Sequence, residues 1–199
     1  MSRSTRWNNA AAVLTLALTM TAPNARAVDP ATPGTSPGVL LKEFVYDEAP
    51  FAQCHAATLI ETPSGLVAAW FAGTREGHAD VGIWLSRQVD RRWLPPVEVA
   101  DGIQSDALRH PCWNPVLERD GGKPNAELRL YYKVGPSPSR WWGMVKTSKD
   151  DGKTWSAARR LPEGILGAIK NKTVRLDDGT LLSGSSTEHD GWRVHLERS

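Results

Sequence analysis

The stretch Ser148–Trp155 reads S-K-D-D-G-K-T-W and joins the apolar runs 141–147 and 156–161. Asp150 and Gly152 supply turn chemistry, because an aspartate side chain bonds nearby backbone groups and glycine accepts a positive φ. Ser148 and Thr154 can add bonds from side chain to backbone, and Trp155 gives the turn an apolar anchor. The stretch therefore predicts a hairpin turn between two strands.

A degenerate copy of this stretch lies earlier in the chain, where Ser86–Trp93 reads S-R-Q-V-D-R-R-W. Its serine and tryptophan keep the same separation, but the acidic residue is displaced. A larger unit of short strand, turn and second strand begins at Thr58, Val116 and Thr173, which are almost evenly spaced. A repeat of roughly 50 residues with several strands is typical of propeller blades.

The pattern S-x-D-x-G-x-T-W resembles the Asp-box (BNR) hairpin of sialidase-like β-propellers at all five signature positions. The resemblance covers Leu40–Ser199. It implies an all-β propeller of the sialidase type, six-bladed when complete, with about two and a half blades in this chain. A third Asp-box would open at Ser199, so we expect the chain to be the N-terminal part of a longer protein.

Residues 1–27 have the layout of an export signal. Arg3 and Arg6 precede the apolar run Ala10–Met20, and Ala25-Arg26-Ala27 forms an A-x-A cleavage site. Residues 28–38 are predicted to be a flexible linker and residues 39–199 the partial propeller, beginning with a strand at Val39–Tyr46. We expect a secreted or periplasmic protein without a membrane span, because the apolar run is shorter than about 20 residues.

The charge balance argues against a nucleic-acid partner. The whole chain has 24 basic and 22 acidic residues, and removal of the signal takes away three arginines, leaving 21 basic against 22 acidic. No basic tract interleaved with aromatic residues is present. The tryptophans at 84, 93, 142, 155 and 192 recur at equivalent blade positions and are predicted to pack between blades.

Alternation of strand direction assigns the polar residues to one face. The first blade is predicted to have strands at Ala56–Glu61, Leu66–Phe71, Val81–Leu85 and Val97–Val99. Because neighbouring strands are antiparallel, the start of the first strand and the loop 73–80 share a face, and the Asp-box turns lie on the opposite one. The face of the loop 73–80 is the predicted ligand face.

The resemblance implies roles for two residues in that loop. In the sialidase family an arginine ends the second strand of the first blade and an acid/base aspartate follows, and Arg75 and Asp80 occupy these positions. Arg75 would bind a sugar carboxylate, for which a guanidinium is well shaped. The family's first arginine is replaced by His55, which becomes the second catalytic candidate. A turn cap for Asp80, a surface ion pair between Arg75 and Glu76, and a structural role for His55 are the alternatives.

The same face in the three blades supplies the remaining candidates for substrate binding. One of Lys170 and Lys172 is expected to face a sugar carboxylate and the other to be solvated. Trp113 or Trp141 could stack on a sugar or pack in the core. The candidates are Glu76, His78, Trp113, Asn114, Arg140, Lys170, Asn171 and Glu188.

Cys54 and Cys112 lie at equivalent entries to adjacent blades. In an exported protein they could form a disulfide, unless the blades hold them beyond the Cα separation limit of about 7 Å. Spacings typical of metal ligands or phosphate-binding loops are absent, so no metal or cofactor is expected.

Three functions stay open from the sequence. The first is an exo-glycosidase, similar to sialidases, that hydrolyses a terminal acidic sugar. The second is a polysaccharide lyase acting at a uronic acid such as a glucuronate linked to rhamnose, with a histidine as base. The third is a glycan-binding propeller without catalysis, because a fold does not fix a function.

Overall fold

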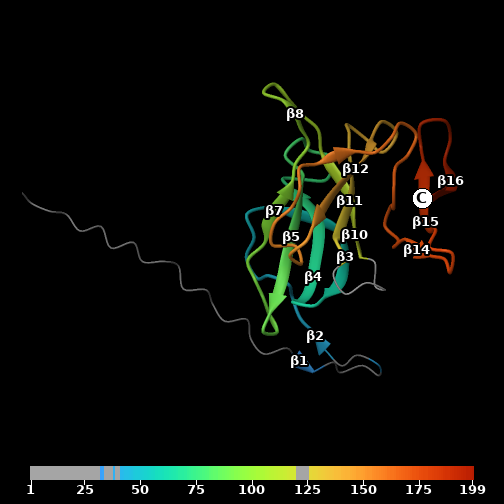
Figure 1. The fold of residues 1–199 in the computed structure, drawn as a ribbon. Coiled ribbons are helices and arrows are strands. Elements are labelled where there is room, and N and C mark those ends of the chain that lie inside the picture. The colour runs from blue at the N-terminus through green and yellow to red at the C-terminus, as the bar shows by residue number, and fades with distance from the viewer. Residues whose placement is uncertain (1–31, 34–37, 39–40, 120–125) are drawn as a thin grey trace, which may run out of the picture.

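The computed structural model describes residues 32–33, 38, 41–119 and 126–199, and all the regular elements in these ranges are β-strands (Figure 1). The signal at 1–27 lies outside the described residues. The three repeats form three antiparallel sheets in chain order, and two further strand pairs, β1–β2 and β8–β9, form two-stranded sheets. The predicted all-β fold is confirmed.

Each sheet is one blade. The first contains β3 (Gln53–Thr62), β4 (Gly65–Gly73), β5 (Gly82–Val89) and β7 (Val97–Ala100), with β6 (Arg92–Trp93) also paired to β5. The second contains β10 (Cys112–Arg119), β11 (Leu128–Val134), β12 (Trp142–Ser148) and β13 (Arg159–Arg160). The third contains β14 (Val174–Arg175), β15 (Leu181–Thr187) and β16 (Arg193–Arg198). Between the first two blades lies a hairpin of β8 (Ile103–Ser105) and β9 (Leu108–Arg109).

Strand β4 is buried on both faces and divides the interior in two. Val67, Ala69 and Phe71 face a core shared with β5, β10 and β11 of the second blade. The alternate residues Trp70 and its neighbours on the other face are covered by the chain at 45–51. Burial of side chains of this size stabilises the fold by roughly 1.5–3 kcal/mol each. Trp142 and Trp155 pack against the core between the first two blades, as predicted, whereas Trp84 and Trp93 pack on the other face of the first blade.

The Asp-box is a hydrogen-bonded turn. The Ser148 hydroxyl donates to Asp150 Oδ1 at 2.8 Å and accepts the Gly152 N–H at 2.8 Å. Asp150 also accepts the Thr154 N–H and hydroxyl, and Gly152 takes a φ of 82°. The neighbouring Asp151 accepts the Ser64 hydroxyl at 2.6 Å from the β3–β4 turn. The two turns therefore share a face, as predicted.

The degenerate copy at 86–93 folds differently. Its acidic residue, Asp90, is displaced into a tight hairpin turn with Arg91, and both have positive φ, as a type I′ turn requires. Ser86 turns its hydroxyl to the Leu94 carbonyl at 2.6 Å instead of to an aspartate. A tight hairpin thus replaces the Asp-box in the first blade.

The strand predicted at Val39–Tyr46 is largely wrong. Within its described part, β2 spans Leu41–Lys42 and pairs with β1 (Thr32–Pro33), which lies inside the predicted linker. The following residues are held by side chains, since Glu43 accepts the Trp93 indole N–H and Tyr46 lies on Trp70 at 5.3 Å. Aromatic packing, not strand pairing, attaches this segment to the first blade.

Cys54 and Cys112 are both free thiols. Cys54 pairs across strands with Ala72, so it lies on the face covered by Tyr46, whose hydroxyl donates to its sulfur at 3.1 Å. Cys112 is buried in the core on the opposite face, where burial raises the pKa of its thiol. Strand alternation therefore separates the two sulfurs, and the possible disulfide is absent.

Candidate functional site

Each blade carries one non-glycine residue with positive φ near the start of its first strand. These are Ala56 (55°), Asn114 (39°) and Lys170 (62°), the last of which precedes β14. In β3 and β10 the pairing register shifts at this point, which defines a β-bulge. Bulges re-aim side chains, and strained backbone of this kind clusters at functional sites. The three blades thus distort their backbones at equivalent positions on the predicted ligand face.

A cavity of about 600 Å³ opens beside these three positions. It receives side chains from all three blades, and seven of the predicted site residues line it. They are His55, Glu76, Trp113, Asn114, Lys170, Asn171 and Glu188. The structure therefore brings together residues as distant in the sequence as His55 and Glu188.

Four predicted residues, Arg75, His78, Asp80 and Arg140, do not line this cavity. Asp80 accepts the Thr74 hydroxyl at 2.6 Å and the Thr74 N–H at 3.2 Å, and lies 2.6 Å from His78 Nδ1. These bonds, led by the one from the Thr74 hydroxyl, lower the pKa of Asp80 to about 2. A carboxyl group ionised to that extent is a poor proton donor near neutral pH. The contacts match the turn-cap alternative, and a catalytic role for Asp80 stays a prediction.

Backbone hydrogen bonds and a close approach to the second blade hold the loop 74–80 in place. The His78 N–H reaches the Arg75 carbonyl and the Val81 N–H reaches the His78 carbonyl, both at 3.0 Å. Gly77, with a φ of 78°, passes close to the Trp113 ring, where an added Cβ would be 3.4 Å away. The loop therefore lies against the second blade and fixes the place of Glu76.

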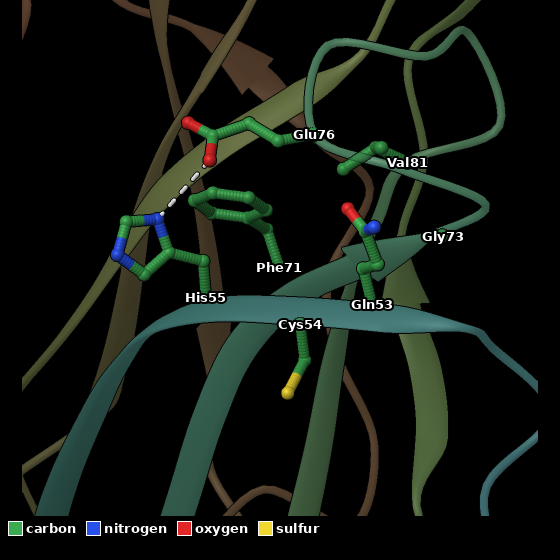
Figure 2. Close-up of a pocket in the computed structure, with 7 residues that line it drawn as sticks. All are labelled: Gln53, Cys54, His55, Phe71, Gly73, Glu76 and Val81. Atoms are coloured by element: carbon green, nitrogen blue, oxygen red, sulfur yellow. Dashed lines mark ion pairs between the residues drawn. The ribbon is translucent and has the colours of Figure 1, made fainter.

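A smaller cavity of about 290 Å³ adjoins the first at His55 and Glu76. Figure 2 shows the residues that line it. His55 Nδ1 is directed at Glu76 Oε2, 3.3 Å away, and the Phe71 ring lies beside this pair. His55 meets the Phe71 ring edge-on, with centroids 5.5 Å apart and planes at 76°. His55 and Glu76 therefore form a pair shared by both cavities.

Aromatic rings continue from His55 into the second blade. Phe71 contacts Trp113, and Trp113 contacts Trp141, each with centroids 6.1 Å apart. Trp113 is buried, and its indole N–H donates to the Gly135 carbonyl at 2.9 Å, so packing is its main role. Trp141 is half-buried and lines the cavity, but its indole N–H is buried and has no hydrogen-bond partner among the described residues.

The two candidate lysines have different surroundings. Lys172 Nζ donates to the Leu117 carbonyl of the second blade at 2.7 Å, whereas Lys170 lines the cavity. In the part of the chain that the structure describes, the Lys170 ammonium makes no hydrogen bond or ion pair. Lys170 is therefore the lysine available to an anionic ligand, and Lys172, which is exposed, also donates across to the second blade.

The wall that carries Lys170 is held by buried polar groups. Glu197 accepts the N–H groups of Leu166 and Gly167 at 2.8 and 2.6 Å, and Lys133 donates to the Ala168 carbonyl at 2.6 Å. The Ser185 hydroxyl donates to the Gly167 carbonyl at 3.3 Å. This network fixes the backbone immediately before Lys170.

Sequence reasoning missed several lining residues of the third blade, Ser186, Thr187, Trp192 and Arg193. The packing role predicted for Trp192 is wrong, because its side chain is 85% exposed. Trp192 directly precedes β16 as Trp141 precedes β12 and Val81 precedes β5, and all three line a cavity. Alignment of Trp192 with Trp141 instead of Trp142 would have indicated this position.

No cluster of three or more metal-ligating side chains occurs among the described residues. In the same part of the chain, no helix has the length and apolarity that a membrane span needs.

Comparisons with known proteins agree with this fold. Residues 64–199 match the BNR repeat-like domain. No curated protein matches the chain by sequence. The Hadza microbial sialidase Hz136 aligns with 73% of this chain and 35% of its own, at 18% identity and a TM-score of 0.61.

Two further structures are similar at comparable levels. An α-L-arabinofuranosidase from Lactobacillus brevis aligns with 79% of this chain and 56% of its own, at 15% identity and a TM-score of 0.54. The Trypanosoma rangeli sialidase in complex with sialic acid aligns with 87% and 32%, at 13% identity and a TM-score of 0.52. At these identities the likeness shows the fold, and the chain spans about a third to just over half of each structure.

Proposed function

Because the chain belongs to the BNR repeat-like domain family, we propose that it forms part of an exported glycosidase that removes a terminal acidic sugar from a glycan. The cavity of about 600 Å³ is the proposed sugar site. Its mixture of indole, amide and charged groups suits a sugar, which offers an apolar ring face and many hydroxyls. The secreted or periplasmic location belongs to the proposal and rests on the export signal predicted at 1–27.

Lys170 is the observation that carries the preference for an acidic sugar. Lys170 lines the cavity, its exposed ammonium has no partner among the described residues, and its backbone has a φ of 62°. A non-glycine residue in this conformation costs on the order of 1–3 kcal/mol, so the surrounding structure must impose it. A sugar carboxylate is the group that would satisfy such a cation by a charge-assisted hydrogen bond.

A lyase is the second candidate, favoured by the exposed imidazole of His55 beside Glu76. In this reaction His55 would take the proton from the carbon next to a uronate carboxylate. The released electron pair would form a C=C bond, and the glycosidic C–O bond would break, its oxygen taking a proton from solvent. Lys170 would stabilise the negative charge that develops on the carboxylate.

Binding and turnover test the proposal with the full chain. Calorimetric titration with N-acetylneuraminic acid, glucuronate and neutral arabinose should show tighter binding of an acidic sugar. Lys170→Met should weaken that binding roughly tenfold to a hundredfold, the range for a hydrogen bond to a charged group. The matched control Lys149→Met changes an exposed lysine at the Asp-box turn and should have no effect.

Product analysis separates the candidates. Release of a free terminal sugar from a sialylated oligosaccharide supports hydrolysis, and new absorbance from a C=C bond with a uronate oligosaccharide supports a lyase. Binding without either product would leave a glycan-binding propeller. The acidic-sugar proposal is wrong if arabinose binds as tightly as the acids or if Lys170→Met binds them normally.

A further inference from the structure

The contact between His55 and Glu76 is exposed to solvent and adds little to the stability of the fold. The side chains are 65% and 54% exposed, and Nδ1 and Oε2 lie 3.3 Å apart. Ion pairs at such exposure contribute about 0–1 kcal/mol. Both side chains line both cavities, so the contact lies where a ligand would enter and not at the edge of the fold.

The structure fixes the imidazole from three sides. The β-bulge after His55, with Ala56 at a φ of 55°, sets the direction of the side chain. Phe71, the cross-strand partner of His55, holds the ring by an edge contact at 5.5 Å. Glu76 then lies opposite Nδ1, while Nε2 points to the other side of the ring (Figure 2).

A carboxylate beside one ring nitrogen selects the tautomer. Ionised Glu76 can accept a hydrogen bond and cannot donate one, so a carboxylate 3.3 Å from Nδ1 favours the neutral tautomer that carries its proton on Nδ1. Nε2 is then left with a free lone pair. A neutral histidine held in this form can accept a hydrogen bond, or a proton, from a ligand group on the Nε2 side.

The neighbouring acid, Asp80, provides a contrast within the same loop. It is occupied by the Thr74 hydroxyl, the Thr74 N–H and His78, so it secures the loop ends. Among the described residues, Glu76 makes no such bonds to the loop, and its carboxylate contacts His55. The loop 74–80 therefore presents Glu76 to His55 while Asp80 keeps the loop in place.

We propose that Glu76 is a positioning residue that holds His55 with Nε2 unprotonated, and that Nε2 contacts the sugar bound in the larger cavity. The second half rests on the proposed function. It changes the role of Glu76 from a substrate ligand, as predicted from the sequence, to a residue that acts through His55.

Imidazole ¹⁵N NMR of the full chain, recorded at a pH where the spectrum shows His55 to be neutral, tests the first half without any ligand. His55 should show a protonated Nδ1 and an unprotonated Nε2. Glu76→Leu removes the acceptor at similar volume and should move His55 towards the Nε2–H form. Glu76→Gln carries both an accepting oxygen and a donating NH₂ group, so it should give proportions of the two tautomers between those of wild type and Glu76→Leu. Glu163→Leu, an exposed glutamate outside both cavities, is the matched control and should change nothing.

Addition of N-acetylneuraminic acid or glucuronate tests the second half. The Nε2 resonance of His55 should shift on binding, and affinity should fall roughly threefold to tenfold in Glu76→Leu, the loss of one hydrogen bond, and less in Glu76→Gln. An Nε2–H tautomer in the wild-type chain, or a Glu76→Leu variant with the same tautomer as wild type, overturns the positioning role. Binding without an Nε2 shift overturns the sugar contact. If neither acid binds, the proposed function fails, while the tautomer still decides the role of Glu76.

Discussion

Ser148 links the Asp-box signature to the stability of the second blade. Ser148 is only 3% exposed. Its hydroxyl accepts the Gly152 N–H and donates to Asp150. Substitution Ser148→Ala removes the acceptor and leaves that N–H unpaired inside the turn. Because a buried unpaired donor costs about 1–3 kcal/mol, we expect the free energy of unfolding to fall by that amount.

Urea denaturation of Ser148→Ala measures this loss. Ser139→Ala is the control, because the Ser139 hydroxyl is exposed and contacts only Ser137 among the described residues, so a change below about 0.5 kcal/mol is expected. Equal stability of the two variants would show that the signature serine has no structural role.

Single residues also show what the sequence could predict about the site. His55, Lys170 and Glu188 were predicted because antiparallel strands bring the corresponding loops of each repeat to one face, which depends on periodicity alone. The direction of a long side chain does not follow from periodicity. Lys172 crosses to Leu117 while Lys170 enters the cavity, and Asp80 turns back to Thr74. These choices depend on contacts between blades that no local pattern contains.

At the scale of elements, lysines close both joints between blades. Lys146 Nζ donates to the Val99 carbonyl at 2.6 Å across the first joint. Lys133 donates to Ala168 and Lys172 to Leu117 across the second. Each lysine donates a hydrogen bond to a backbone carbonyl on the other side of the joint. The packing of the blades therefore also pairs these carbonyls. Lys133 is fully buried, so its charge carries a large desolvation cost.

Burial lowers the pKa of Lys133 to about 7, opposed in part by Glu197. Between that value and 10.5, the unfolded chain binds a proton that the folded chain releases, so the free energy of unfolding rises with pH. The rise is at most about 1.4 kcal/mol per pH unit. Lys133→Met should remove this contribution from the pH dependence.

Chemical denaturation between about pH 7 and 8 measures the effect, and the contribution of the two free cysteines is the same in wild type and variants, so it cancels in the difference. In that window, the stability of the wild-type chain should rise relative to Lys133→Met, whereas the exposed control Lys149→Met should follow the wild type. A constant difference between wild type and Lys133→Met would mean that Lys133 keeps one protonation state throughout.

The strands and turns that follow a repeating sequence pattern were predictable, and the segments without such a pattern were not. The strands of the first blade and the Asp-box turn followed from alternation and turn residues. The segment 43–51 did not, because Tyr46 and Phe51 pack on Trp70 and Trp84 by their rings instead of by strand pairing. The separation of Cys54 from Cys112 also required knowing which face each strand residue occupies.

At the scale of the whole molecule, the third blade presents an apolar face. Alternate residues of β16, together with the tryptophan just before it, point to this face. Trp192, Val194 and Leu196 are 85%, 87% and 71% exposed, and Val174 of β14 is 58% exposed. In the first blade, the sheet face towards the second blade is covered by β10 and β11. Figure 1 shows β14–β16 at one side of the molecule, with β16 outermost.

We expect the chain to self-associate through this face, because exposed apolar patches and open strand edges both promote pairing with another chain. The double substitution Val174→Glu with Leu196→Glu places like charges on the face and should restore a monomer, while Leu108→Glu, on the separate β8–β9 hairpin, should not. Sedimentation velocity across a range of protein concentrations measures the distribution of species. A wild-type chain that stays monomeric at high concentration, or a double variant that associates as strongly as wild type, would show that the face of β14–β16 does not drive association.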